Sequence, residues 1–592
     1  MNEVVTLLGE GITRHQAGDL DAAEKIYRQV LDRQPGYADA IHLLGVIDFQ
    51  RGRLTEAEAL VTGAIAIDGK VAIYHANLGR IRMAQGRAEA AIVPYREAIG
   101  LTPDDAALHS DLAAALVTYE DFDGARSRAR LAIDLDPNLA QAHLNLGLAL
   151  RGLGGPSARG AAACFRRAAE IDPGLADAQQ ALGEALQATG DEDGALDCYR
   201  RAIHARPGMV EAHCNLGNIL RERMDLDAAL VQYAAALEYD PEIAAVHANQ
   251  AVALHEKSRF EDALEAYARA LAIAPNDPEI RRNRAMTLLL LGRFEDAWPE
   301  FEWRWKTARF QAERRKWKKP QWTADQLATD PDNTVLIHAE QGLGDMVQFI
   351  RYAHRLRDLG FHVAVECPRP LVRLIAAMPS VMQVVEKGDP LPSHDFHIPV
   401  MSLPGAFKTT SATIPGDVPY LTAPRPDVDR WRTALSELKG TKIGICWKGS
   451  PDHPRDRVRS PGLAAFLPLF NLPGASLVSL QKQGGEADLK ARGVAGRLFD
   501  PTPDLPDLAA AAALIAGLDL VVTCDTAVAH LAGALGRPVA LVLPHVAEWR
   551  WMAGRNDTPW YPAMRLFRQP APGDWASAMD DVAAHIRRHR LR

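Results

Sequence analysis

The sequence predicts an α-helical solenoid over residues 1–305, followed by an α/β region built from two parallel-sheet halves. Three observations lead to this prediction. Small residues, alanines and prolines recur every 34 residues through the first half, which is the period of a repeated helical hairpin. Beyond residue 333, short apolar runs alternate with helical segments, the pattern of parallel α/β units. Glycine-containing or polar turns follow two of those apolar runs directly.

Prolines and alanines recur at fixed positions in each repeat unit. A proline, or a glycine in one unit, closes each repeat at Pro35, Gly69, Pro103, Pro137, Pro173, Pro207, Pro241 and Pro275, with a two-residue slip near residue 155. Twelve residues earlier stands an alanine, at Ala23, Ala57, Ala91, Ala125, Ala161, Ala195, Ala229 and Ala263, and Ala297 marks a ninth, degenerate unit. This pattern resembles the tetratricopeptide repeat. The resemblance implies stacked hairpins with a concave surface that holds another protein.

A polar residue recurs once per repeat along the first helix of the hairpin, at Asn77, Asp111, Asn145, Asn215, Asn249 and Asn283. A carboxamide both donates and accepts, so the five asparagines could pair with the backbone of an extended acceptor peptide. The row resembles the asparagine ladder of protein O-GlcNAc transferases. Packing between neighbouring repeats is the alternative interpretation, and it stays open here.

A second row consists of His75, His109, His143, His213 and His247. Packed helices lie about 8–10 Å apart, whereas metal–nitrogen bonds are about 2 Å long, so one histidine per repeat does not converge on an ion. We expect packing or groove lining, and no metal site.

Tryptophans alternate with basic residues between residues 297 and 322. Such a segment could bind nucleic acid by stacking and charge, but a solenoid must also bury its last apolar face. Capping of the solenoid and docking of the next domain is therefore the favoured interpretation. The predicted domains are a solenoid at 1–305, a junction at 306–332 that ends in the proline-containing loop 330–332, and two α/β halves at 333–424 and 425–592.

In the first α/β half, strand 334–338 leads into a glycine turn at 341–345 and a helix over 346–359, with further strands at 362–366, 381–385 and 396–399. A strand, a glycine turn and a helix N-terminus together favour anion binding. Asp345 at the start of the helix could also be merely a cap.

The second half places strands at 442–447, 476–481 and 518–523, and a helix at 508–516. The segment 524–531 opens another helix directly after the third strand. Two such halves with a cleft between them form a GT-B arrangement.

Two motifs resemble the signature regions of the ADP-heptose heptosyltransferase family: Gly342-Leu343-Gly344-Asp345, and Asp525-Thr526 followed by His530. The runs 447–449, 456–460, 549–551, 557–562 and 566–569 are similar to bacterial proteins that fuse tetratricopeptide repeats to such a transferase, among them flagellin glycosyltransferases that attach nonulosonic, sialic-like acids. For Trp549, Trp551 and Trp560, packing and acceptor contact both remain open.

The resemblance implies a role for each matching residue. Asp345 corresponds to a general base that takes the proton from an acceptor hydroxyl. The implied donor-binding residues are Gly342, Gly344, Lys448, Arg459, Ser460, Asp525, Thr526 and His530. Gln481 and Lys482 are further candidates for binding the donor, because they stand at the carboxyl end of a predicted strand, where ligands of α/β folds bind. Two features depart from the family pattern: Ala527 stands where the family usually has glycine, and the loop before Arg459 is longer and richer in charge.

Composition narrows the range of partners. With 67 Lys and Arg against 75 Asp and Glu, the net charge of −8 argues against general affinity for nucleic acid or anionic lipid. The six cysteines form no Cys-x-x-Cys pair, which is typical of a reducing compartment. Neither a signal-like start nor a run of 18 apolar residues is present. We expect a cytoplasmic protein without membrane insertion.

The combined expectation is a protein O-glycosyltransferase that inverts the sugar and needs no metal, since no Asp-x-Asp motif lies at a strand end. No cofactor is expected, and the nucleotide sugar is a substrate. The resemblance implies transfer of a nonulosonic acid from a CMP-activated donor to Ser or Thr of flagellin held by the repeats. UDP-GlcNAc or another hexose nucleotide is the alternative donor. A repeat scaffold with an inactive transferase domain is the alternative function.

Overall fold

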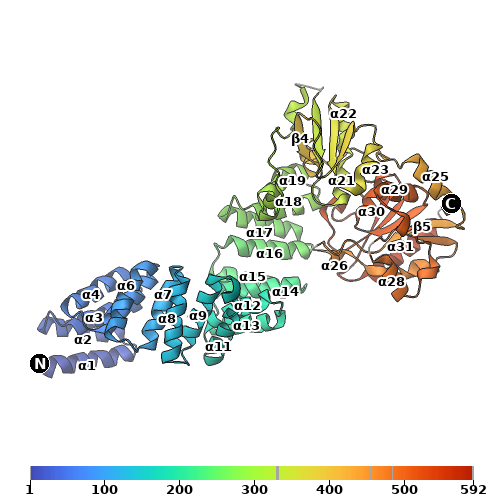
Figure 1. Ribbon diagram of the computed structural model, residues 1–592. Coiled ribbons are helices and arrows are strands. Elements are labelled where there is room, and N and C mark those ends of the chain that lie inside the picture. The colour runs from blue at the N-terminus through green and yellow to red at the C-terminus, as the bar shows by residue number, and fades with distance from the viewer. Residues whose placement is uncertain (1, 329–332, 454, 483, 590–592) are drawn as a thin grey trace. The chain divides into compact units, whose positions relative to one another are not determined.

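The computed structural model describes residues 2–328, 333–453, 455–482 and 484–589, and the predicted loop 330–332 lies outside them. The chain forms two compact units, Met1–Glu242 and Ile243–Arg592 (Figure 1). The division falls inside the repeat array, so the last repeats belong to the same unit as the α/β region. The predicted order of a helical solenoid and then parallel α/β sheets is confirmed.

The first unit is made of antiparallel helical hairpins. Its helices are α1 Asn2–Gln16, α2 Leu20–Arg33, α3 Ala38–Gln50, α4 Leu54–Ile67, α5 Ala72–Ala84, α6 Ala88–Leu101, α7 Ala106–Thr118, α8 Phe122–Leu135, α9 Ala140–Leu153, α10 Gly155–Ala158, α11 Ala161–Ile171, α12 Ala176–Ala188, α13 Glu192–Ala205, α14 Val210–Glu222 and α15 Leu226–Tyr239. The short α10 coincides with the slip in the sequence period.

Small residues allow the two helices of a hairpin to pack closely. The repeat alanines are buried, and Ala23, Ala57, Ala91 and Ala125 have no exposed surface. A Cβ atom added to Gly79 would lie 2.6 Å from the ring of Tyr95, so this contact requires glycine. The 34-residue period of the sequence therefore reflects the contacts between the two helices of each hairpin.

The histidine row has a structural role. The Nε2 atoms of His75, His109, His143 and His213 lie 2.8–3.0 Å from the backbone oxygen of the residue six positions earlier, which closes the preceding repeat. Gln179, at the equivalent position of the slipped repeat, donates to the oxygen of Pro173 at 3.3 Å. The side chain at this position thus fastens the turn between repeats.

The second unit begins with the last repeat helices and continues into the α/β region. Its helices are α16 Ala244–Glu256, α17 Phe260–Ile273, α18 Pro278–Leu290, α19 Phe294–Phe301, α20 Ala308–Glu313, α21 Leu343–Phe349, α22 Tyr352–Asp358, α23 Val372–Ala376, α24 Leu403–Ala406, α25 Arg425–Ser436, α26 Asp456–Arg459, α27 Gly462–Phe466, α28 Gly485–Ala491, α29 Leu508–Ala516, α30 Ala527–Ala534 and α31 Trp575–His589. The predicted helix 346–359 is instead two helices, α21 and α22. They are separated at Arg351, whose buried guanidinium donates to the Trp560 oxygen at 2.9 Å.

Each α/β half has one parallel sheet. The first contains β1 Thr334–His338, β2 His362–Cys367, β3 Gln383–Glu386 and β4 Phe396–Pro399 in the order β3-β2-β1-β4. The second contains β5 Thr441–Cys446, β6 Ala475–Ser479, β7 Leu520–Cys524, β8 Val539–Leu543 and β9 Met564–Arg568 in the order β6-β5-β7-β8-β9. We did not predict β8 and β9 as strands, although β8 is an uninterrupted apolar run.

Aromatic residues join the last repeat helices to both halves. Trp298 of α19 is buried, stacks on Phe294 and donates from its indole to the Thr409 oxygen at 2.7 Å. Its ring also meets Trp549 edge to face at a centroid distance of 5.8 Å. The end of the repeat array is therefore part of the hydrophobic core of the second unit.

The structure also distinguishes between packing and acceptor contact for the three tryptophans of the second half. Trp549, Trp551 and Trp560 are at most 2% exposed, so they belong mainly to this core.

Among the helices within the described ranges, none combines the length and the apolar character needed to cross a bilayer.

Candidate active site

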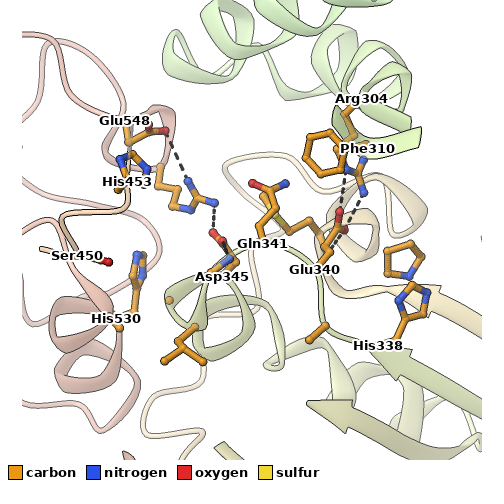
Figure 2. A pocket seen from close by; sticks show the side chains of 18 of the residues that line it. Arg304, Phe310, His338, Glu340, Gln341, Asp345, Ser450, His453, His530 and Glu548 are labelled. Carbon is orange, nitrogen blue, oxygen red and sulfur yellow. Dashed lines mark hydrogen bonds and ion pairs between the residues drawn. The ribbon is translucent and has the colours of Figure 1, made fainter. Parts of the chain in front are cut away.

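A cleft of about 2060 Å³ lies in the second unit. Its walls come from the junction after the repeats, from the carboxyl ends of the first sheet and from loops of the second sheet. Figure 2 shows Asp345 between the Arg304–Glu340 pair on one side and His453 and Glu548, from two different loops, on the other. Ligands of parallel α/β sheets commonly bind at the carboxyl ends of the strands, so this cleft is the candidate active site.

The loop after β1 holds Asp345 in place. The backbone N–H of Gly342 donates to Oδ2 of Asp345 at 2.8 Å. A Cβ atom on Gly344 would approach Cδ2 of His530 to 2.9 Å, so glycine lets α21 pack against α30. The two predicted motifs, one in each half, are therefore in direct contact.

Asp345 also binds an arginine from the second half. The guanidinium of Arg550 donates to Oδ1 of Asp345, and its Nη1 lies 3.7 Å from a carboxylate oxygen of Glu548. Arg550 is only 8% exposed. Burial by itself would lower the pKa of Arg550, but the charges of Asp345, Glu548 and Asp525 raise it above its usual value.

The segment after β7 presents Asp525, Thr526 and His530 toward the same cleft. Burial raises the pKa of Asp525 to about 6, and the nearby charge of Glu548 acts in the same direction. Thr526 is the N-cap residue of α30, yet its side chain makes no capping hydrogen bond and instead lies 3.2 Å from the Thr523 hydroxyl. The N-terminal end of α30 thus faces the cleft and can receive an anionic group.

His530 is a buried, neutral residue. Its Nδ1 lies 3.0 Å from the hydroxyl of Tyr561, and its ring stacks on Trp551 at a centroid distance of 5.1 Å. Burial, followed by the charges of Arg550 and Arg351, lowers the pKa of His530 well below its usual value. The side chain therefore supports the junction between α21 and α30 without carrying charge.

The remaining predicted donor residues surround the carboxyl ends of β5 and β6. Gln481 accepts hydrogen bonds from the backbone N–H groups of Trp447 and Lys448, each at 3.0 Å. The ammonium of Lys448 pairs with Asp488 at 2.6 Å. Lys482 donates to the Leu505 oxygen at 2.6 Å. The polar groups of Gln481, Lys448 and Lys482 thus make hydrogen bonds or ion pairs with other residues of the chain.

Arg459 is placed differently. Its guanidinium lines the cleft and makes a long contact of 3.4 Å with Asp456. Ser460 accepts from the backbone N–H of Gly449 at 2.9 Å and donates to Asp456 at 2.7 Å, so it shapes the loop. Of the predicted donor cations, Arg459 is the one best placed to meet a ligand.

The asparagines of the repeats do not share one environment. Asn145 is 1% exposed and donates to the Ser110 oxygen of the neighbouring repeat at 2.9 Å. Asn77 donates to His42 at 2.8 Å. Asn215, Asn249 and Asn283 are half-buried. Packing between repeats thus uses at least two of the five carboxamides.

Two buried arginines of the cleft were absent from the predicted site. Arg550 lies in the run 549–551, which resembles the fused transferases, but no function was predicted for it from the sequence. Arg304 forms a bidentate pair with Glu340, with N–O distances of 2.8 and 3.1 Å, and donates to the Ser402 hydroxyl at 2.7 Å. The chain separations of these pairs are too long for any local motif to reveal them.

Comparisons with known proteins find matches to the helical repeats and to part of the second α/β half. The tetratricopeptide repeat is matched at residues 14–81, 181–236 and 214–278, and a TPR repeat at 79–118. Glycosyltransferase family 9 (heptosyltransferase) is matched at residues 497–543, which include β7, α30 and β8. The chain therefore combines tetratricopeptide repeats with a region of the heptosyltransferase type.

Protein FlbA of Caulobacter vibrioides is 29% identical over 317 residues, which cover 49% of this chain and 52% of that protein. The chain thus spans about half the length of this curated relative. Among solved structures, the MamA protein is 24% identical, with a TM-score of 0.27, covering 29% of this chain and 94% of its own. YrrB, described as a TPR protein with an unusual peptide-binding site, is 21% identical, with a TM-score of 0.26, covering 31% and 95%.

Proposed function

We propose that the protein is a protein O-glycosyltransferase that uses a nucleotide sugar and selects its acceptor through the repeats. The observation that carries the proposal is the position of Asp345 in one cleft with Asp525 and α30. A carboxylate from one half faces a helix N-terminus from the other, which suits a proton acceptor opposite a phosphate site. The match to the heptosyltransferase family over residues 497–543 supports the same reaction class.

In this proposal Asp345 accepts the proton of a Ser or Thr hydroxyl as its oxygen attacks the anomeric carbon. The bond between that carbon and the donor phosphate breaks, and its electron pair leaves with the nucleotide. Attack from the face opposite the leaving group inverts the sugar. Arg459 and the N-terminal end of α30 stabilise the charge on the leaving phosphate, a role that requires no metal.

Arg550 positions the base. Its contact to Asp345 joins the donor half to the acceptor half, and its contact to Glu548 lies within the donor half. A fixed carboxylate orientation lowers the entropic cost of reaching the transition state. In the proposed division of labour, residues 333–424 face the acceptor and residues 425–592 bind the nucleotide sugar.

The finer proposal concerns the substrates. The similarity of several sequence runs to flagellin glycosyltransferases favours a CMP-activated nonulosonic acid as donor and flagellin as acceptor. Of the repeat asparagines, the half-buried Asn215 in the first unit and Asn249 and Asn283 in the second would contact the acceptor chain, whereas Asn77 and Asn145 pack between repeats.

Nucleotide binding tests the donor. Thermal unfolding is measured with increasing CMP, UDP or ADP, because a ligand that binds the folded state raises the melting temperature with its concentration. CMP is expected to stabilise most. Preference for UDP would instead indicate a hexose donor, and no stabilisation by any nucleotide would favour a repeat scaffold with an inactive transferase domain.

A further inference from the structure

The cleft carries a charge opposite to that of the whole chain. Its described lining residues include thirteen Lys or Arg and six Asp or Glu, whereas the chain as a whole has a net charge of −8. A concentration of one sign in a concave site attracts ligands of the other sign. The arrangement of these cations indicates which ligand they suit.

Several of the cations come from a strap formed by residues 314–322, between α20 and the first sheet. The strap is fixed to that sheet at several points. Arg315 pairs with Glu366 through contacts of 2.8 and 3.1 Å, and Trp317 stacks on His397 at a centroid distance of 4.1 Å. The N–H of Trp322 donates to the His397 oxygen at 2.9 Å. The strap is therefore a built part of the cleft wall.

Next to these anchors the strap presents exposed cations to the cleft. Arg314, Lys316 and Lys319 all line it and are exposed. Lys387, which follows β3, lies on the same side and is also exposed. The acids on this wall, Glu340 and Glu366, already pair with Arg304 and Arg315, so they do not neutralise the exposed cations.

These cations lie in the half opposite the proposed donor segment. Apart from Gly342 and Gly344, the donor residues follow β5, β6 and β7 in the second sheet, whereas the strap borders β1, β2 and β4 of the first. The charged ends of exposed lysine and arginine side chains can pair with carboxylates at variable positions along a flexible chain. A phosphate in a fixed pose would instead call for buried, converging donors.

We propose that the strap cations bind an acidic segment of the acceptor protein, with Asp or Glu side chains flanking the hydroxyl that receives the sugar. This inference rests on the proposed transfer to a protein acceptor and adds a charge requirement to it. Electrostatic attraction of this kind raises the association rate and selects among acceptors, and it weakens with salt.

Direct binding tests the inference with the full chain. Fluorescently labelled serine peptides with two acidic, two neutral amide or two basic residues on each side are titrated with the protein, and anisotropy is recorded. The acidic peptide should bind at least about tenfold more tightly than the amide peptide, consistent with several exposed ion pairs. The difference should shrink as salt is raised.

The double variant Lys316→Glu/Lys319→Glu should lose about tenfold in affinity for the acidic peptide and keep the thermal stabilisation by nucleotide. Lys318→Glu is the matched control, because Lys318 is exposed on the same strap but is not among the described residues that line the cleft. It should change affinity less than twofold. An equal loss in the control would overturn the inference.

Three further outcomes would also contradict it: equal binding of acidic and amide peptides, loss of nucleotide stabilisation in the double variant, or stronger competition by an RNA oligomer than by the acidic peptide. Failure of the proposed function gives a different result. In that case charge-dependent peptide binding persists, but no peptide gains sugar mass with any donor.

Discussion

The guanidinium of Arg550 donates to Oδ1 of Asp345, while the backbone N–H of Gly342 donates to Oδ2 of the same carboxylate. One contact comes from within the loop after β1 and the other from the opposite half. The two contacts set the orientation of the carboxylate. The proposed base is therefore held by both sides of the cleft that it serves.

Replacing the proposed base should abolish turnover without preventing donor binding. Asp345→Ala and Asp345→Asn are expected to lower kcat by about 10²–10⁴, the usual contribution of a general base. Nucleotide stabilisation, measured by thermal unfolding, should persist. Asp358→Asn, which changes an exposed acid at the end of α22, serves as the control. Turnover at half the wild-type rate or more in either Asp345 variant would exclude the role.

Removing Arg550 should affect both stability and rate. Arg550→Ala leaves Asp345 and Glu548 without their shared cation, and loss of one partner of a largely buried pair costs about 3–5 kcal/mol. Urea unfolding measures this cost. Arg550→Lys keeps the charge but loses the planar fork, so an intermediate effect is expected. Added guanidinium at non-denaturing concentration should restore part of the turnover of Arg550→Ala, and wild-type stability and rate in that variant would contradict the account.

The raised pKa of Asp525 makes stability depend on pH. Because its folded-state pKa is about 6, above the unfolded value of about 3.9, the protonated acid stabilises the fold at low pH. That contribution is lost as the pH rises through 6. Asp525→Asn removes the dependence, so the variant should gain up to about 3 kcal/mol relative to wild type between pH 4 and pH 7. Urea unfolding at pH 4, 5, 6 and 7 checks this, and a constant difference would show that Asp525 titrates normally.

The histidine row predicts a modest structural effect. His143→Leu removes the bond to the Pro137 oxygen and should cost about 0.5–1.5 kcal/mol. His143→Gln should cost less, since Gln179 makes the equivalent bond in its own repeat. Thermal unfolding of both variants provides the measurement. If zinc stabilised the wild type but not His143→Leu, the rejected metal hypothesis would have to be restored.

Much of the fold could be predicted from the sequence because its packing is local and repeated. An alanine every 34 residues marks the contact between paired helices, and the strands of the α/β region are short apolar runs. The helix predicted over 346–359 was wrong in its continuity. At the break, Arg351 forms a buried hydrogen bond to the oxygen of Trp560, which is 209 residues away and which no local pattern indicates.

The candidate site was predictable only in part, because local motifs can be recognised in a sequence and long-range contacts cannot. Asp345, Asp525 and His530 were identified from motifs, each of which is local. The contacts of Asp345 with Arg550 and of Glu340 with Arg304 join residues that are 205 and 36 positions apart. No spacing rule connects them, and Arg550 lies within a tryptophan run that looks like core.

The most direct test of the proposed transfer is the intact mass of the acceptor. Purified flagellin is incubated with the protein and a CMP-activated nonulosonic acid, and its mass is recorded before and after reaction. The wild type should add the mass of one or more sugars at Ser or Thr, and Asp345→Ala should add none. Equal glycosylation by both proteins would contradict the role of Asp345. An unchanged flagellin mass with CMP-, UDP- and ADP-activated donors would contradict the transfer itself.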